Sequence, residues 1–418
     1  MPASYLSLST NLAYAKGAYT VAVEFGSERE RANLALDTGS STLVVLPRAY
    51  DPTRDRSLQP TAWAQQVKYG QGMWAGPVLH TEIGLGEGQR ARRLSCVPFA
   101  VVQAAAQNFR DYDGLFGLAY QCLDRARDMR AVLTAQGVSP QLTWPWPFPV
   151  DDGSDLAAFR NTLRQQPAVM LTPLFTVAED RGVLADKFAM LILRSLVHVL
   201  DDEATLRELA NDPLNRGVLV LGGGEECQDL YEGPFRDVRI VHDLYYNANL
   251  SSVQVGSQPP IPVPPLDAVD VERAASNAIF DTGSSFVVLE SSVYAAVREG
   301  FARHDARFPA LIDRFAQSFQ NERGLPNSTI DHRDWPDLHF HLEAPDGGEV
   351  RLSCTPGDYW QRNALHAGES CFLLLDQLPG WPKQSILGLP VLAGYYCIFD
   401  RRAREPGGVL RIAKAQGT

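Results

Sequence analysis

A short motif that occurs once in each half of the chain constrains the fold more than any other feature. Residues 34–45 read LALDTGSSTLVV, and residues 278–289 read AIFDTGSSFVVL. Each copy consists of an apolar stretch typical of a strand, the turn Asp-Thr-Gly-Ser-Ser, and a second apolar stretch. Because internal repetition decides architecture, the motif predicts two lobes of similar build. Each lobe would present one carboxylate, Asp37 or Asp281, on a tight turn.

The chemistry of two carboxyl groups explains why this residue type is used twice. Two carboxyl groups in near contact do not both ionise readily, so they share one proton. The ionised group can take a proton from water, and the protonated group can donate to a substrate carbonyl. The titration belongs to the pair, so we assign neither role to Asp37 or Asp281 alone. We expect hydrolysis without a metal or an organic cofactor, because the pair supplies both proton transfers.

The other residues of each turn suit the support of a carboxylate. The glycine has no Cβ, which lets the turn fold closely, and the first serine is placed to donate to the carboxylate. The threonine hydroxyl could bond across the interface between the lobes. One Asp-Thr-Gly turn alone would be a weak signal, because small polar turns are common. The predicted support residues are Thr38, Gly39, Ser40, Thr282, Gly283 and Ser284.

The doubled motif resembles that of the pepsin-like aspartic proteases. Further resemblance extends along nearly the whole chain, in residues 68–76, 113–120, 218–223, 386–388 and 395–401. The first of these segments, KYGQGMWAG, and the second lobe are most similar to the memapsin, or β-secretase, branch. The resemblance implies an all-β, bilobal fold with a few short helices and an active-site cleft between the lobes. It places residues 1–195 in the first lobe and residues 196–418 in the second.

The resemblance also implies a flap, a hairpin that closes over bound substrate. Tyr69 matches the flap tyrosine, and Gly70, Gln71, Gly72 and Trp74 match further substrate-binding positions. A glycine-rich tip can bend over a peptide and exclude water. Without the catalytic turns, Tyr69 would be read as an ordinary strand aromatic.

Departures from the family pattern affect the expected specificity. Val44 stands where pepsins carry a tryptophan, and Val288 stands where memapsins carry an arginine. Substrate preference therefore does not transfer from β-secretase. We expect a cleft that accepts apolar side chains beside the scissile bond.

Local patterns predict several elements away from the motif. Residues 154–165 read as a helix with apolar positions on one face, residues 201–211 as an exposed acidic helix, and residues 293–303 as a helix capped by Ser291 or Ser292. The aromatic, proline-rich residues 144–149 read as a surface insertion packed on its own lobe, or alternatively as part of a cleft wall or a docking segment. Residues 188–200 are too short and too polar for a membrane helix and are expected to form a buried strand.

Charge and cysteine usage narrow the expected partners. The net charge of −11 argues against nucleic acid or an anionic membrane as the main partner. We expect a monomer whose partner is a polypeptide substrate. None of the six cysteines forms a Cys-x-x-Cys pair, which disfavours a zinc ribbon. Cys96 and Cys397 read as buried thiols, and Cys354 could reach Cys371.

The memapsin disulfide pattern is not kept, which favours a reducing compartment. The first residues show neither a secretory signal nor a basic pro-segment. The sequence therefore reads as a mature form or as a chain without a pro-segment, as in pepsin-like bacterial proteins.

The predicted function is that of an aspartic endopeptidase active at acidic pH. A non-catalytic pepsin-fold binding protein or inhibitor is the alternative, although such relatives usually lose a catalytic aspartate. A metal-dependent hydrolase is disfavoured because the histidines and aspartates form no ligand cluster.

Overall fold

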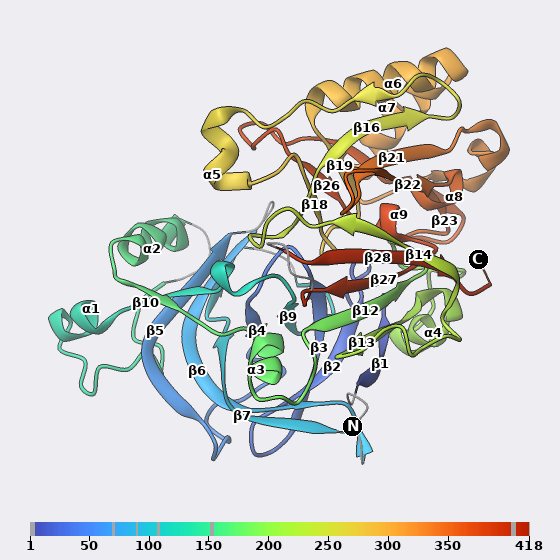
Figure 1. Ribbon diagram of the computed structural model, residues 1–418. Coiled ribbons are helices and arrows are strands. Elements are labelled where there is room, and N and C mark those ends of the chain that lie inside the picture. Colours follow the sequence, from blue (N-terminus) through green and yellow to red (C-terminus); the bar gives the residue numbers. More distant parts are fainter. Residues whose placement is uncertain are drawn as a thin grey trace. The chain divides into compact units, whose positions relative to one another are not determined.

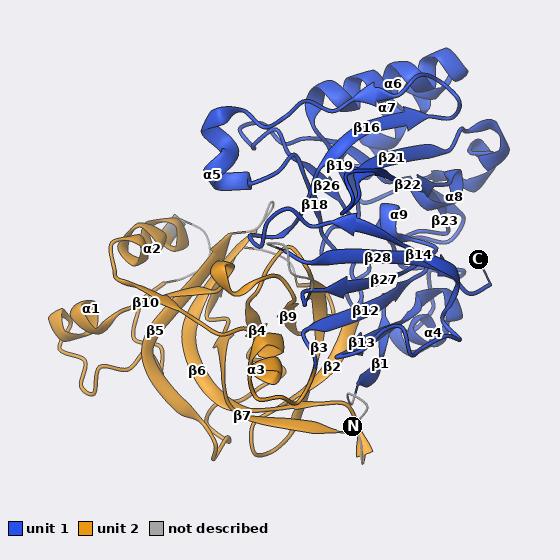
Figure 2. Ribbon diagram, viewed as in Figure 1, with its two compact units in different colours: residues 1–19, 185–418 blue, residues 20–184 orange. Residues whose placement is uncertain are grey.

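The computed structural model describes residues 5–68, 72–88, 91–106, 109–150, 154–402 and 407–417 (Figure 1). The chain forms two compact units, as Figure 2 shows. Unit 1 comprises residues 1–19 and 185–418, and unit 2 comprises residues 20–184. Both consist mainly of strands, with short helices, which confirms the predicted all-β fold of the pepsin-like type.

Unit 2 is built around a sheet whose strands follow the order β11-β10-β5-β6-β7-β4-β9-β3-β2, and β6 also pairs with β2. The strands are β2 (Thr20–Phe25), β3 (Glu30–Asp37), β4 (Leu43–Val45), β5 (Gln59–Lys68), β6 (Met73–Leu85), β7 (Arg92–Val101), β8 (Ala104–Ala105), β9 (Gly114–Gly117), β10 (Arg125–Asp128) and β11 (Ala168–Met170). The β6–β2 pairing brings the sheet round on itself. Phe25, Tyr50 and Phe99 fill its interior, with ring centroids 5.3–5.7 Å apart.

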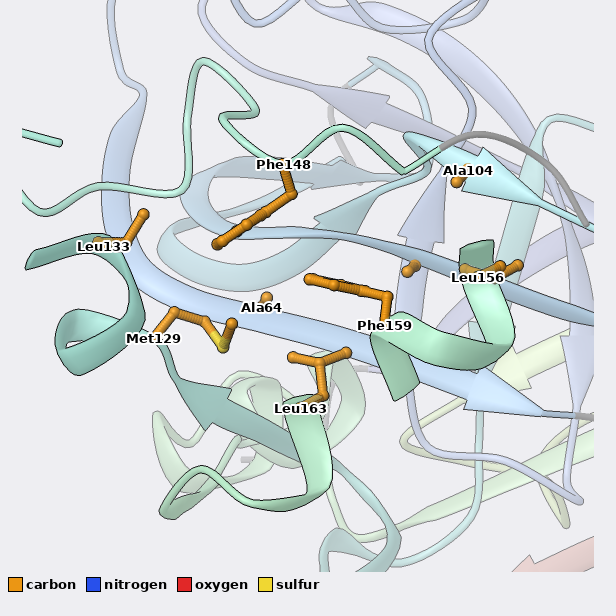
Figure 3. Close-up of a cluster of buried hydrophobic side chains, with 9 residues drawn as sticks. Ala64, Ala104, Met129, Leu133, Phe148, Leu156, Phe159 and Leu163 are labelled. Carbon is orange, nitrogen blue, oxygen red and sulfur yellow. The ribbon is translucent and has the colours of Figure 1, made fainter. Parts of the chain in front are cut away.

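The helices of unit 2 are α1 (Arg130–Ala135), α2 (Ser154–Arg164) and α3 (Leu174–Asp180). Helix α2 confirms the predicted helix, and its apolar face, formed by Leu156, Phe159 and Leu163, is buried in the cluster of Figure 3. Phe148 lies in the same cluster, with its ring centroid 5.1 Å from that of Phe159. The proline-rich residues 144–149 are therefore an insertion packed on their own unit, as the favoured interpretation predicted.

Unit 1 contains four sets of paired strands. One has the order β1-β13-β12-β27-β28-β14, and the others are β15-β18-β26-β19-β25, β17-β16-β21-β22 and β20-β24-β23. The first set consists of β1 (Leu6–Asn11), β12 (Lys187–Ile192), β13 (Arg216–Leu221), β14 (Tyr231–Arg239), β27 (Tyr395–Asp400) and β28 (Val409–Ala415). The second consists of β15 (Tyr246–Ala248), β18 (Ala278–Phe280), β19 (Val287–Leu289), β25 (Leu374–Asp376) and β26 (Ser385–Leu387). The last two sets comprise β16 (Leu250–Val255), β17 (Ile261–Pro262), β20 (Leu325–Pro326), β21 (Leu338–Glu343), β22 (Glu349–Cys354), β23 (Trp360–Arg362) and β24 (Glu369–Phe372).

Strand β12 covers the start of the apolar run 188–200 and is buried between β13 and β27, which confirms the predicted strand. Among the described residues, no helix combines the length and the apolar character that crossing a membrane requires.

The helices of unit 1 are α4 (Leu206–Asn211), α5 (Val271–Ala274), α6 (Ser291–His304), α7 (Phe308–Phe319), α8 (Pro356–Tyr359) and α9 (Leu389–Leu392). Helix α4 begins later than predicted, because Thr205 and Glu208 form a capping box that fixes its start. The predicted serine cap of α6 is wrong. Glu290 is the N-cap, and its carboxylate accepts from the backbone N–H groups of Ser292 at 2.9 Å and Val293 at 3.2 Å.

None of the six cysteines, all of which lie in the described ranges, forms a disulfide. Cys354 and Cys371 are not linked; their sulfurs donate instead to the carbonyl oxygens of Pro390 and Ala364. Cys397 is buried as expected, but Cys96 is exposed at an irregularity in the β6–β7 pairing.

Candidate active site

The Asp37 turn of unit 2 is held by a third strand that runs between its two arms. Asp37 ends β3, which pairs in parallel with β9 so that Asp37 lies opposite Gly117. Strand β4, which follows the turn, pairs antiparallel with the other edge of β9. A Cβ at Gly117 would lie 2.4 Å from the backbone of Ser41 and Thr42, so this close crossing requires glycine.

Hydrogen bonds fix the Asp37 carboxylate on both oxygens. The N–H of Gly39 donates to Oδ1 at 2.8 Å, and the hydroxyl of Ser40 donates to Oδ2. The turn backbone is held as well, because Leu118 N–H donates to the Asp37 carbonyl at 2.7 Å and Ala119 N–H donates to the Ser40 carbonyl at 2.8 Å. Asp37 is 6 % exposed.

The Asp281 turn of unit 1 repeats this arrangement. Asp281 follows β18, which pairs in parallel with β26, and β19 pairs antiparallel with the other edge of β26. Gly283 N–H donates to Asp281 Oδ1 at 2.8 Å, the same distance as in the first turn. A Cβ at Gly388 would lie 2.2 Å from the Phe286 carbonyl oxygen, so the crossing again requires glycine.

Two differences distinguish the second turn. Pro390 has no N–H and occupies the place of Ala119, and the Ser284 carbonyl accepts instead from Leu389 N–H at 2.9 Å. The predicted bond from Ser284 to its carboxylate is also replaced, because Ser284 Oγ donates to the Phe286 carbonyl at 2.8 Å. Ser285 Oγ donates to the Gly17 carbonyl at 2.6 Å, so the N-terminal segment supports this turn.

The remaining predicted residues occupy distinct environments. Thr38 and Thr282 are fully buried. Strands β5 and β6 form the hairpin expected for the flap, with Lys68 paired with Met73, and Gly72 directly precedes β6. The tip residues Tyr69, Gly70 and Gln71 lie outside the described residues. Trp74 is fully buried on β6, opposite Val67, in the pair next to the Lys68–Met73 pair that precedes the tip.

A buried carboxyl group that the sequence did not reveal lies beside the first turn. The side chain of Asp124 accepts hydrogen bonds from Gln65 Nε2 at 2.8 Å and Thr42 Oγ1 at 3.3 Å. Burial raises the pKa of Asp124 to about 7, although both hydrogen bonds lower it. The three residues are far apart in the sequence, and residues 121–128 carry no motif that identifies Asp124.

Tyr112 is a second ionisable neighbour of the first turn. Burial, with a contribution from the negative charge of Asp37, raises the pKa of Tyr112 to about 12. Tyr112 is therefore neutral at acidic and neutral pH. Within the described part of the chain, no group of three or more histidine, cysteine, aspartate or glutamate side chains could hold a metal ion.

Comparison with known proteins identified similarity to a protein family and to a β-secretase. Residues 245–406 match the family described as xylanase inhibitor C-terminal. The β-secretase of Strongylocentrotus purpuratus is 18% identical over 405 residues, which cover 93% of this chain and 65% of that protein. The chain thus spans about two thirds of the length of this relative. Both similarities support a pepsin-like aspartic protease fold, a fold that also occurs in inactive inhibitors.

Proposed function

We propose that this chain is an aspartic endopeptidase in which Asp37 and Asp281 activate water for attack on a peptide bond. The observation that carries this proposal is the matched geometry of the two turns. In each, an aspartate leaves a strand at the same point of a three-strand crossing and accepts a 2.8 Å bond from the glycine two residues later.

The mechanism requires both carboxyl groups to meet one water molecule. The ionised carboxyl takes a proton from the water as its oxygen attacks the scissile carbonyl carbon. The protonated carboxyl donates to the carbonyl oxygen as the tetrahedral intermediate forms, and proton transfer to the leaving amine completes hydrolysis. The N–H groups of Gly39 and Gly283 keep each carboxylate in a fixed orientation, which lowers the reorganisation that the reaction requires.

The β5–β6 hairpin would act as the flap. Its arms are paired up to Lys68 and Met73, and Trp74, in the neighbouring pair, is buried. Tyr69 and its neighbours at the tip would close over the peptide and exclude water. We further propose that apolar side chains flank the scissile bond. A peptide-library profile dominated by charged residues there would contradict this preference.

Proteolysis of an unfolded protein substrate between pH 3 and pH 7, with and without pepstatin, tests the proposal. Asp37→Asn and Asp281→Asn should each lower kcat/KM by about a thousandfold or more. Asp346→Asn is a matched control, because exposed Asp346 accepts the same kind of bond, from Gly348 N–H at 2.9 Å. Activity that survives either catalytic substitution would contradict the dyad.

A second candidate, a non-catalytic binding protein or inhibitor, is favoured by one observation. Residues 245–406 match a family described as a xylanase inhibitor domain. On this alternative the folded chain cleaves no substrate at any pH but lowers the activity of a xylanase in a titration. The peptidase proposal expects the opposite result in both assays.

A further inference from the structure

We propose that Asp124 is a positioning residue that ties the β5 arm of the hairpin to the Asp37 turn, and that its protonation state sets how tightly the two are held. The consequence for catalysis rests on the proposed peptidase function. The structural coupling does not depend on the peptidase function, so an experiment can contradict one of the two proposals and leave the other standing.

Three buried side chains form the connection, which we call the Asp124 cluster: Thr42, Gln65 and Asp124. Gln65 lies on β5, three residues before the end of the strand. Its Nε2 lies 2.8 Å from Asp124 Oδ1 and 3.2 Å from Thr42 Oγ1. All three residues are at most 3 % exposed. The cluster therefore connects the arm of the hairpin to two other segments in a region without solvent.

Thr42 links the cluster to the catalytic turn. It directly precedes β4, and its carbonyl accepts from the N–H of Gly117, the glycine opposite Asp37. The neighbouring Ser41 Oγ donates to the Tyr120 carbonyl. A change in how Gln65 is held therefore reaches the Asp37 turn through one side chain and one backbone bond.

No opposite charge compensates the buried carboxylate. Within the described residues Asp124 forms no ion pair, and the arginines beside it are engaged elsewhere. Arg125 Nε donates to the Cys122 carbonyl, and Arg127 donates to the Gln166 carbonyl. The other described elements bring no compensating charge to Asp124 either. Strand β5 contributes the neutral amide of Gln65, and Gln65 pairs with Gly76 on β6. The Asp37 carboxylate is bonded within its own turn.

Uncompensated burial raises the pKa of Asp124 to about 7, so the group takes up a proton between neutral and acidic pH. An ionised carboxylate accepts charge-assisted hydrogen bonds, which are roughly twice as strong as neutral ones. These bonds do not offset the burial of the charge, because the pKa is raised, so ionisation of Asp124 favours an opened cluster in which water reaches the carboxylate. Gln65 Nε2 also donates to the Arg125 carbonyl at 3.4 Å, and Gln65 Oε1 is buried without a partner among the described residues. The hairpin arm is therefore held more tightly at acidic pH, where Asp124 is protonated, and more loosely at neutral pH.

Hydrogen exchange of residues 59–68, followed by mass spectrometry at pH 5 and pH 8, tests the coupling in the full chain. Protection factors corrected for intrinsic exchange should be about fivefold lower at pH 8 than at pH 5 in the wild type. Asp124→Asn should show equal protection at both pH values, close to that of the wild type at pH 5. Asp128→Asn, four residues away and paired with exposed Arg130, should behave as the wild type. Equal protection of the wild type at both pH values would overturn the proposal.

A second variant and a kinetic measurement separate coupling from folding defects. Gln65→Leu keeps the carboxyl group but removes the link, so its protection should be low at both pH values even if Asp124→Asn does not fold. The ratio of kcat/KM for Asp124→Asn to wild type should rise from about 1 at pH 5 to about 5 at pH 8. A constant ratio would exclude a catalytic effect of Asp124. A chain that cleaves nothing would remove the peptidase proposal, and the exchange data would still decide the coupling.

Discussion

At the scale of single residues, the two Asp-Thr-Gly turns proposed to be catalytic differ in where one serine hydroxyl donates its hydrogen bond. Ser40 donates to the Asp37 carboxylate, whereas Ser284 donates to a backbone carbonyl. A donor bonded to the charged form of a carboxyl group favours that form. Ser40 therefore supports the carboxylate of the proposed dyad directly, and Ser284 supports the backbone of its turn.

Substitution of the two serines should reveal this asymmetry. Ser40→Ala removes a bond to the ionised carboxylate, so the lower pKa of the kcat/KM profile should rise by about half a pH unit to one unit. Ser284→Ala is the matched control and should shift it by less than about 0.3 unit. Equal shifts in both variants would show that the Ser40 hydroxyl has no specific effect on the ionisation of the pair.

The carboxylate of Asp55, also in unit 2, is held by hydrogen bonds from neutral donors. Asp55 accepts from the hydroxyls of Tyr50, Ser57 and Thr81 and from the N–H groups of Ser27 and Ser57. Burial raises its pKa, but these hydrogen bonds outweigh burial and hold the pKa well below its usual range. The group therefore stabilises the fold above its unfolded pKa of about 3.9, and this contribution is lost only as pH falls through the lower folded pKa.

Removal of this carboxylate should destabilise the protein even at the acidic pH proposed for catalysis. Asp55→Ala leaves buried donors unpaired and should cost about 3 kcal/mol of unfolding free energy at pH 4.5, measured by urea denaturation. Asp51→Ala, nearby and more solvent-accessible, should cost less than about 1 kcal/mol. A loss at pH 7 that disappears at pH 4.5 would contradict the lowered pKa.

Asp124 should produce the opposite pH dependence. Its folded pKa of about 7 lies above its unfolded value, so the folded protein binds more protons between these two pKa values. Stability from this group is complete below pH 4 and is lost as pH rises toward 7. Asp124→Asn should remove about 3–4 kcal/mol of this slope in denaturation between pH 4 and pH 8. An unchanged slope would mean that the carboxyl stays ionised.

At the scale of elements, helix α2 and the proline-rich segment stabilise one another. Phe159 contacts both Trp146 and Phe148 through ring pairs with centroids 5.6 and 5.1 Å apart. These contacts anchor the insertion on β5 through Ala64, which belongs to the same cluster. Helix α2 is not expected to be stable without this surface, because isolated helices of this length have only marginal stability in water.

Phe159→Ala should therefore cost about 3–4 kcal/mol and release the insertion to proteases. The measurement is limited proteolysis with mass mapping of cuts within residues 140–165, together with the thermal unfolding midpoint. Ala158→Ser, on the exposed side of the same helix, provides the control. Cuts that appear elsewhere first would show that the insertion does not depend on this cluster.

At the scale of the whole molecule, the repeated motif predicted two lobes of similar build, each with one aspartate on a tight turn, and the resemblance to the pepsin-like proteases predicted the all-β fold. The third strand that crosses each turn was not predicted, because it comes from a distant part of the sequence. The acceptor of the Ser284 hydroxyl was not predictable, because it depends on where the Phe286 carbonyl lies after folding. The same holds for Glu290 as the cap of α6, since a glutamate ranks below the two serines beside it on local preference. Asp124 was not predicted as a site residue, because its hydrogen-bond partners, Thr42 and Gln65, contact it only in the tertiary structure.

The place of strand β1 in unit 1 affects the order in which the chain can fold during synthesis. Its residue Leu6 pairs with Leu221, and β1 belongs to unit 1, whereas the chain in between builds unit 2. At translation rates of roughly 5–20 residues per second, the first strand waits on the order of 10–40 s for its partner to emerge from the ribosome. During that interval residues 20–184 can complete their own sheet. Until then Leu6, Leu8 and Leu12, which are buried in the folded protein, lack residues 215–221, with which they form backbone hydrogen bonds.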